Sequence, residues 1–324
     1  MPVCERDPWR EQYFAGVPCP EDVRIPTDDP DAYAWYPAWN GIYDKLHVAR
    51  SQGMAAGDAA SPPARFPVFV KPRYSMKGMS VDARRAGDAA AFRRLCRDGA
   101  IWQQFCEGEH VSTDFAVVDG SVAWLRHATG LPTHSGMFDH WRIHADGLPG
   151  LGERLAAWVE AELPGYSGMA NTESIGGRII EAHLRFADQW PDLYGPGFVE
   201  AAIGLYCGQG WSFPAEARRD GFSTPLFLAK GPRFRHPPAS LQRDIRALPG
   251  VSSLQITFHE DRDPAAHPMP AGGFRVAIVN SWTRRAGRDA IAALWREWFA
   301  REGEAVSDVS GGEPIARNAP EDDR

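Results

Sequence analysis

The sequence lacks any hydrophobic run that approaches the roughly 18 consecutive apolar residues typical of a transmembrane helix. Its first residues, MPVCERDPWREQ, are charged and interrupted by proline, so the apolar stretch of a secretory signal peptide is also missing. The five cysteines are scattered and form no CxxC pair, which excludes zinc-site spacing and favours free thiols in a reducing compartment. We therefore expect a cytoplasmic protein that has no membrane partner.

The sequence also has no excess of basic over acidic residues. Acidic residues number 42 and basic residues 35, which gives a formal net charge of −7 with neutral histidine. Nucleic acid and anionic membrane surfaces attract a net basic field, so this balance argues against both as partners. Hydrophobic residues make up 44% of the 324 residues, which is enough for a sizeable core. The length fits about two domains, or one domain with two lobes.

Short apolar segments alternate with helical patterns and predict an α+β fold with several antiparallel hairpins. Hairpin turns are expected at Asp119-Gly120 and at Gly176-Gly177. Residues 131–150 are rich in glycine, proline and histidine and predict a long loop. The principal helices are expected at residues 42–53, 85–96, 152–165 and 197–210, with strands at 66–72 and 101–108.

Polar residues gather on the second predicted hairpin, NTESIGGRIIEAHLRF. Because alternate residues of a strand share a face, one face should hold Asn171, Glu173, Glu181, His183 and Arg185. The opposite face should be apolar and consist of Ile180, Ala182 and Leu184. Two carboxylates this close repel unless a cation lies between them, and Mg²⁺ prefers such oxygen ligands. A solvated face with cross-strand Glu–Arg pairs would produce the same pattern.

A lysine stands near the end of the buried strand FPVFVKP. Burying the ammonium of this residue, Lys71, is costly unless it meets an anion. The following Lys77-Gly78 opens a flexible loop whose backbone N–H groups can close over phosphates. The spacings of a P-loop and of a GxGxxG dinucleotide site are both absent. An edge lysine followed by an ordinary turn is the alternative interpretation.

Taken in order, four segments over roughly residues 42–200 resemble motifs of the ATP-grasp superfamily. YDKLHVARSQGMAAG resembles its early Asp-Lys helix. FPVFVKPRYSMKGMSV resembles the strand ending in Lys-Pro and the glycine loop after it. IWQQFCEGEHVSTDFAVVDG resembles the hinge strand, and GMANTESIGGRIIEAHLRF resembles the metal hairpin. The resemblance implies two α/β lobes whose antiparallel sheets grip a nucleotide.

The resemblance also implies ATP and Mg²⁺ as cofactors, with Mn²⁺ as an alternative metal. It gives catalytic roles to Arg185 and Lys77. The implied nucleotide-binding residues are Lys45, Lys71, Gly78, Met79, Gln103, Gln104, Phe105, Cys106, Glu109 and His110. The implied metal ligands are Glu173, Glu181 and His183. His183 stands where the superfamily usually has asparagine, and His110 stands where an acidic ribose contact is common.

Five segments are expected on this basis. They are an irregular lead segment with at most one short strand (1–41), an N-lobe (42–106), a C-lobe with the metal hairpin (107–210), a strand–helix portion packed on the C-lobe (211–303) and a disordered tail (304–324). Many superfamily members carry a nucleotide-fold domain before the lobes, and the lead segment is too short to be one.

The implied function is ATP-dependent ligation. ATP would phosphorylate a small-molecule or peptide carboxylate to an acyl phosphate, from which an amine or similar nucleophile displaces phosphate. The sequence is also compatible with a homodimer. Two alternatives stay open: a nucleotide-binding module of the same fold with degenerate catalysis, and a metal-dependent hydrolase or dioxygenase that uses His140, His144 and Glu181.

Overall fold

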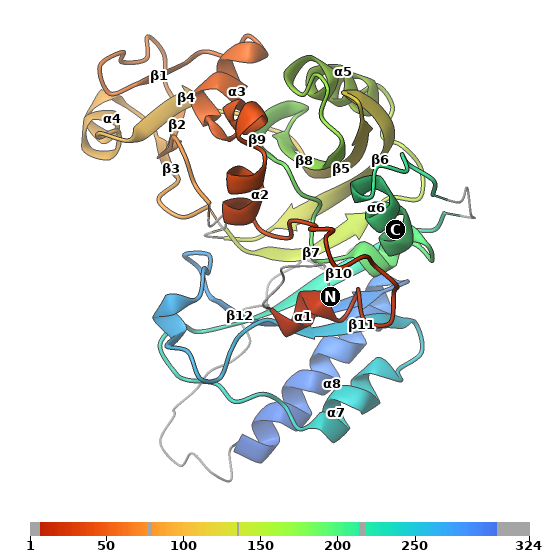
Figure 1. Ribbon diagram of the computed structural model, residues 1–324. Helices are drawn as coiled ribbons and strands as arrows, with labels where there is room; N and C mark the ends of the chain where they lie inside the picture. The colour runs from red at the N-terminus through yellow and green to blue at the C-terminus, as the bar shows by residue number, and fades with distance from the viewer. Residues whose placement is uncertain (1–6, 77–79, 135, 214–217, 303–324) are drawn as a thin grey trace.

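The computed structural model in Figure 1 describes residues 7–76, 80–134, 136–213 and 218–302. It is a mixed structure of helices and two antiparallel sheets, as the sequence predicts. The smaller sheet has 4 strands in the order β1-β4-β2-β3, and the larger has 8 in the order β11-β12-β10-β7-β6-β5-β8-β9. Within the described part of the chain, no helix is long and apolar enough to cross a membrane.

The smaller sheet forms the N-lobe. Its strands are β1 (Ala56–Asp58), β2 (Val68–Pro72), β3 (Arg84–Ala86) and β4 (Ala100–Gln104), and its helices are α3 (Lys45–Ser51) and α4 (Ala89–Leu95). Asp44 begins α3, because its carboxylate accepts hydrogen bonds from the backbone N–H groups of Leu46 and His47. Helix α3 is shorter than predicted, since residues 37–43 form a separate 3₁₀ helix, η1 (Pro37–Tyr43). This cap places Lys45 in the first turn of α3.

The C-lobe is built on five strands of the larger sheet. They are β5 (His110–Val118), β6 (Ser121–Pro132), β7 (Phe138–Ile143), β8 (Gly168–Ile175) and β9 (Arg178–His183), and helix α5 (Leu151–Glu162) packs against them. Both predicted hairpin turns are confirmed. The long loop predicted over residues 131–150 is wrong, because β7 lies inside it. Trp141 and Ile143 of β7 are buried, but the polar residues around them, Asp139, His140 and Arg142, conceal this alternation in the sequence.

The last three strands extend the same sheet. They are β10 (Gly221–Leu228), β11 (Val251–Ile256) and β12 (Phe274–Ser281). Strand β10 joins the C-lobe by pairing its first residues with the end of β7. Helices α7 (Ala239–Arg246) and α8 (Arg284–Glu302) cover one face of these strands (Figure 1) and share a core with them. The short elements α6 (Phe198–Tyr206), η2 (Pro191–Tyr194) and η3 (Pro264–Ala266) complete the fold.

The lead segment contains two short helices that its sequence pattern does not predict, α1 (Pro8–Glu11) and α2 (Asp29–Trp35). Each has an aspartate at the N-cap and a proline in the first turn, where the missing N–H has no intrahelical partner to lose. The prolines and aspartates that suggest irregular structure therefore start these helices. In Figure 1 the lead segment runs between the upper lobes and the lower C-terminal strands. The predicted tail, residues 304–324, lies outside the described residues.

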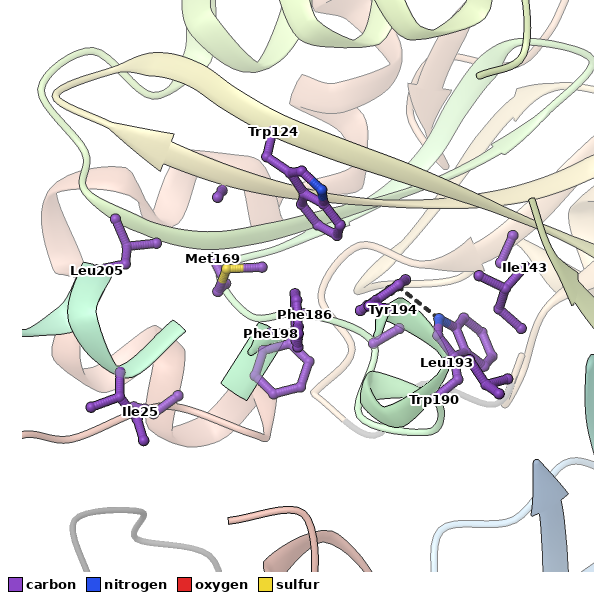
Figure 2. Packing of buried hydrophobic residues seen from close by; sticks show 14 of the residues in the cluster. Ile25, Trp124, Ile143, Met169, Phe186, Trp190, Leu193, Tyr194, Phe198 and Leu205 are labelled. Atoms are coloured by element: carbon purple, nitrogen blue, oxygen red, sulfur yellow. Dashed lines mark hydrogen bonds between the residues drawn. The ribbon is translucent and has the colours of Figure 1, made fainter. Parts of the chain in front are cut away.

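The lead segment is packed firmly into the protein. Phe14 and Ile25 are 4% and 1% exposed and belong to a core cluster that includes Trp190 and Phe198. Figure 2 shows Ile25 in this cluster, together with the hydrogen bond of 2.8 Å from Trp190 Nε1 to the Tyr194 hydroxyl. The burial of these apolar side chains ties the segment to the C-lobe, so its charged residues have fixed positions.

The hinge between the lobes rests on the turn of the β8–β9 hairpin. Gly176 has a φ of +57° and its N–H donates to the Glu109 carbonyl. A Cβ atom added to Gly176 would lie 2.1 Å from the Glu107 carbonyl oxygen. Only glycine therefore allows the hairpin turn and the hinge to approach this closely.

We expect Gly176→Ala to destabilise the protein more than Gly16→Ala. Gly16 also has a positive φ, of +78°, but no atom lies within 4 Å of its added Cβ. Gly16→Ala should therefore cost only the backbone strain of about 1–2 kcal/mol. Gly176→Ala adds the clash with Glu107, so its urea unfolding midpoint should fall further. Equal losses for the two variants would show that the hinge contact is not tight.

Candidate functional site

A cavity of about 500 Å³ lies between the N-lobe and C-lobe sheets. The predicted site residues that line it are Lys45, Lys71, Gln103, Phe105, Cys106, His110, Glu173 and Glu181. They come from α3, β2 and β4 on one side and from β5, β8 and β9 on the other, with Phe105 and Cys106 in the hinge. The two lobes thus bring together side chains that are up to 136 positions apart in the sequence, from Lys45 to Glu181.

Two buried lysines lie at one wall of this cavity. Lys45 and Lys71 are each 6% exposed. Lys45 Nζ lies 2.8 Å from Glu181 Oε1, whereas Lys71 Nζ donates to the Ile180 carbonyl at 2.6 Å. Burial, opposed by the charge of Glu181 and reinforced by that of Lys45, lowers the pKa of Lys71 to about 7. Lys45 pairs directly with a carboxylate and Lys71 pairs with a carbonyl, which leaves the Lys71 ammonium suited to an anion.

A bulge in β9 gives Lys71 its hydrogen-bond acceptor. Glu173 pairs with Glu181 and Ser174 pairs with Ile179, so Ile180 has no partner in the ladder. Ile180 lines the cavity instead of joining the apolar face predicted for it, and this prediction is wrong. The bulge shifts the alternation by one residue. Ile179 therefore joins Ala182 and Leu184 in the core.

The two glutamates lie directly opposite each other across β8 and β9, as the hairpin pattern predicts. Glu173 Oε2 is 3.0 Å from His110 Nε2. Burial alone would raise the pKa of Glu173, but the hydrogen bond from His110 and the charges of His183 and Arg185 outweigh it and lower that pKa to about 2. Glu173 is therefore an anion at neutral pH.

Strand β4 contributes a polar group without a partner. Gln103 is 2% exposed, and within the described residues its Oε1 accepts no hydrogen bond. A buried acceptor without a donor is costly, so the cavity suits a ligand that presents an N–H group there. Phe69 and Phe105 add apolar rings, 6.5 Å apart between centroids, to the same wall.

No model of a known protein family matches the chain, and no curated protein matches its sequence. Solved structures do match. The L-amino acid ligase from Bacillus licheniformis gives a TM-score of 0.60 over 89% of this chain and 82% of that one, at 15% identity. Phosphoribosylamine–glycine ligase from Thermotoga maritima gives 0.59 over 89% and 85%, at 13% identity. Carboxyaminoimidazole ribonucleotide synthase from Aspergillus clavatus, solved with ATP, gives 0.57 over 80% and 74%, at 11% identity.

These similar structures are ATP-grasp proteins. The chain has the ATP-grasp fold. The sequence resemblance and the three-dimensional similarity therefore agree on the architecture, although sequence identity to each of these structures is low.

Several residues that the ATP-grasp resemblance assigns to the site do not line the cavity. Gln104 accepts a hydrogen bond from the Ala55 N–H, and Glu109 is exposed beside the hinge. His183 and Arg185 face a different partner, described below. Lys77, Gly78 and Met79 lie outside the described residues. The roles assigned to all these residues stay predictions.

The turn between β6 and β7 supplies cavity residues that sequence reasoning missed. They are Pro132, Thr133, Gly136, Met137 and Phe138. His110 packs edge-on against Phe138 and Trp141, at ring-centroid distances of 5.2 and 5.5 Å. The signal available in the sequence is the pair Met137-Phe138, which are apolar residues within a stretch assigned to a solvated loop.

The structure does not bring together the residues of the hydrolase or dioxygenase alternative. His140 contacts Asp139, His144 contacts Thr129, and Glu181 contacts Lys45. Across the described ranges, no three His, Cys, Asp or Glu side chains are grouped so that they would hold a metal ion. A metal bound in this cavity would therefore need further ligands besides these side chains.

The carboxylate of Asp29, in the lead segment, contacts both His183 and Arg185, the two polar residues that follow Glu181 on the predicted polar face. Asp29 Oδ1 lies 2.9 Å from His183 Nδ1, and Asp29 Oδ2 accepts a hydrogen bond of 2.9 Å from Arg185 Nη2. Burial opposes ionisation of Asp29, but the charges of Arg185 and His183 outweigh it and hold its pKa well below the usual range. In this chain, Arg185 and His183 are thus bound to the lead segment instead of the cavity.

We expect Asp29→Asn to lower the free energy of unfolding by about 3 kcal/mol at pH 7, because it leaves the Arg185 guanidinium without its carboxylate. Asp22→Asn changes an exposed carboxylate of the same segment and should have almost no effect. The depressed pKa stabilises the folded state above pH of about 4, and this contribution is lost as the pH falls further. Urea unfolding should therefore show a smaller difference in the free energy of unfolding between wild type and Asp29→Asn at pH 3 than at pH 7. A loss that is independent of pH would contradict the ion-pair explanation.

Proposed function

We propose that the protein is an ATP-dependent ligase that activates a carboxylate as an acyl phosphate and joins it to an amine or a similar nucleophile. The observation that carries this proposal is the pairing, in one cavity, of two buried lysines with two opposed glutamates. The similar structures named above include ligases that act on an L-amino acid and on phosphoribosylamine with glycine, which supports the same kind of reaction.

The cavity fits a nucleoside triphosphate. Lys45 and Lys71 would contact its phosphates, because each ammonium is buried at the cavity wall and the ion pair of Glu181 is with Lys45. The unpartnered Gln103 Oε1 would accept a hydrogen bond from the amino group of adenine. Phe69 and Phe105 would pack against the base, and Cys106 lines the same part of the hinge.

Glu173 and Glu181 would hold Mg²⁺, or Mn²⁺, together with phosphate oxygens, since both carboxylates line the cavity and hard cations prefer oxygen ligands. Mg²⁺ would supply positive charge where negative charge develops on the transferred phosphoryl group. The protein's own part is positioning and electrostatics, with no covalent nucleophile on the chain. Lys77, Gly78 and Met79 are proposed to close over the phosphates and exclude water from the acyl phosphate.

A nucleotide-binding module with degenerate catalysis is the second candidate. It is favoured by the contacts of the two glutamates, since Lys45 pairs with Glu181 and His110 pairs with Glu173. In the ligase, phosphate oxygens must replace Glu181 as the partner of Lys45. In the degenerate module, the existing pairs persist and no phosphoryl transfer follows.

Binding of MgATP should raise the melting temperature of the protein, and Lys71→Ala should abolish this shift because it removes a phosphate contact. The chain has four lysines, and Lys230 is exposed and distant from the cavity in sequence, so Lys230→Ala is the matched control. The control should keep the full shift, while a Lys71→Ala protein that responds like wild type would contradict the assignment.

Measurement of ATP turnover distinguishes the ligase from the degenerate module. Release of ADP and phosphate should require a carboxylate and an amine and should fall at least about 100-fold in Glu181→Gln, if Glu181 holds the metal during phosphoryl transfer. Stabilisation by MgATP without any turnover across a broad panel of acids and amines would favour the degenerate module.

The affinity for MgATP should fall as the pH rises above about 7. In the free protein the pKa of Lys71 is lowered to about 7, so its ammonium loses its proton above this pH. Binding to phosphates needs the charged form, and the dissociation constant should rise by up to about tenfold per pH unit between pH 7 and 10. Lys71→Arg keeps the charge and should show a flat profile. Calorimetric titrations at several pH values check this, and an equal slope in both proteins would assign the titration to another group.

A further inference from the structure

Arg275, in β12, is a buried cation without a partner. It is 8% exposed, and within the described part of the chain no hydrogen bond or ion pair of its guanidinium is seen; its Nε is buried and unsatisfied. Its backbone is held on both sides, because its N–H donates to Met269 Sδ and its carbonyl accepts from the Thr257 hydroxyl. The side chain is thus kept in position by the strand, and its charge plays no part in this.

The charged groups that face Arg275 come from the lead segment and from the chain after β9. They are Asp7 and Arg10 of the lead segment and Asp188. Arg10 already pairs with Asp188, and it also lies 3.2 Å from Asp7. Asp7 also has a second partner, because its Oδ1 lies 2.8 Å from His259 Nε2. The two carboxylates near Arg275 therefore have other partners.

Arg275 and Arg10 balance Asp7 and Asp188 in number, but the Arg275 guanidinium makes no direct contact with either carboxylate in the described structure. Burial lowers its pKa to about 10, which Asp188 opposes and Arg10 reinforces. An unpaired cation in a buried position is costly, and proteins usually pair such groups with an anion. A bound anion would also meet the charges of Asp7 and Asp188, so a monoanion suits this position better than a dianion such as phosphate.

We infer that Arg275 forms a binding site for a small-molecule carboxylate at the junction of the C-lobe, the C-terminal strands and the lead segment. A guanidinium fork matches a carboxylate with two parallel hydrogen bonds. Asp188 follows Arg185 by three residues and therefore lies just beyond the strand that carries Glu181. If the proposed ligase function holds, this carboxylate belongs to the acid or to the amine substrate.

The test compares wild type with Arg275→Met, a variant that keeps most of the length of the side chain and removes its charge. The measurement is thermal unfolding without nucleotide or metal. Wild type should be stabilised in a saturable manner, by about 2–5 °C, by at least one of acetate, L-alanine and L-glutamate, relative to sodium chloride of equal ionic strength. Arg275→Met should unfold at the wild-type temperature or higher in buffer and should lose this response. Arg275→Lys keeps the charge without the fork and should need about tenfold more carboxylate.

Arg246→Met is the matched control, because Arg246 is an arginine of α7 whose Nη2 donates to the Leu254 carbonyl. It should keep the carboxylate response. The inference is overturned if wild type shows no saturable shift, if phosphate stabilises it and the carboxylates do not, or if Arg275→Met unfolds well below wild type and still responds. Because no nucleotide is present, failure here leaves the MgATP predictions intact, and failure of MgATP binding leaves this site intact.

Discussion

The register between β8 and β9 is the constraint on which the site depends. It sets Glu173 against Glu181, and the bulge beside this pair releases Ile180 from the ladder so that its carbonyl accepts from Lys71. Two lysines and two glutamates then line one small cavity, where burial and neighbouring charges lower the pKa of Lys71. A shift of one residue would move the glutamates to the opposite face and dissolve this arrangement. The glycine turn that rests on the hinge holds the register.

The lead segment has a larger role than its length suggests. Its apolar residues anchor it in the C-lobe core, and its charged residues reach the chain on either side of the end of β9. Asp29 holds Arg185 and His183, while Arg10 holds Asp188. These contacts order the polar residues at the end of the β8–β9 hairpin and in the chain that follows it.

Agreement between prediction and structure follows the range of the interactions involved. The two hairpin turns, the opposed glutamates and the lysine near the end of β2 depend on neighbours in sequence, and all were predictable. Strand β7 was not, because Trp141 and Ile143 are buried in a core cluster with residues distant in sequence, among them Ile25 and Trp190. The bulge at Ile180 was missed for a similar reason. For an isolated strand, regular alternation is the best assumption. Only the pairing with β8 shows that one residue of β9 has no partner in the ladder.

By itself, the sequence determined the order of the motifs, the α+β character and the set of candidate site residues, because these follow from local spacing and from side-chain chemistry. Only the tertiary structure decided which of those residues share the cavity. Lys45, Lys71, Glu173 and Glu181 meet there, whereas His183 and Arg185 are bound by Asp29 from 154 and 156 positions away. Pairing of buried charges is a property of the folded protein, since partners are chosen by proximity in space, and the sequence pattern of one strand contains no information about them.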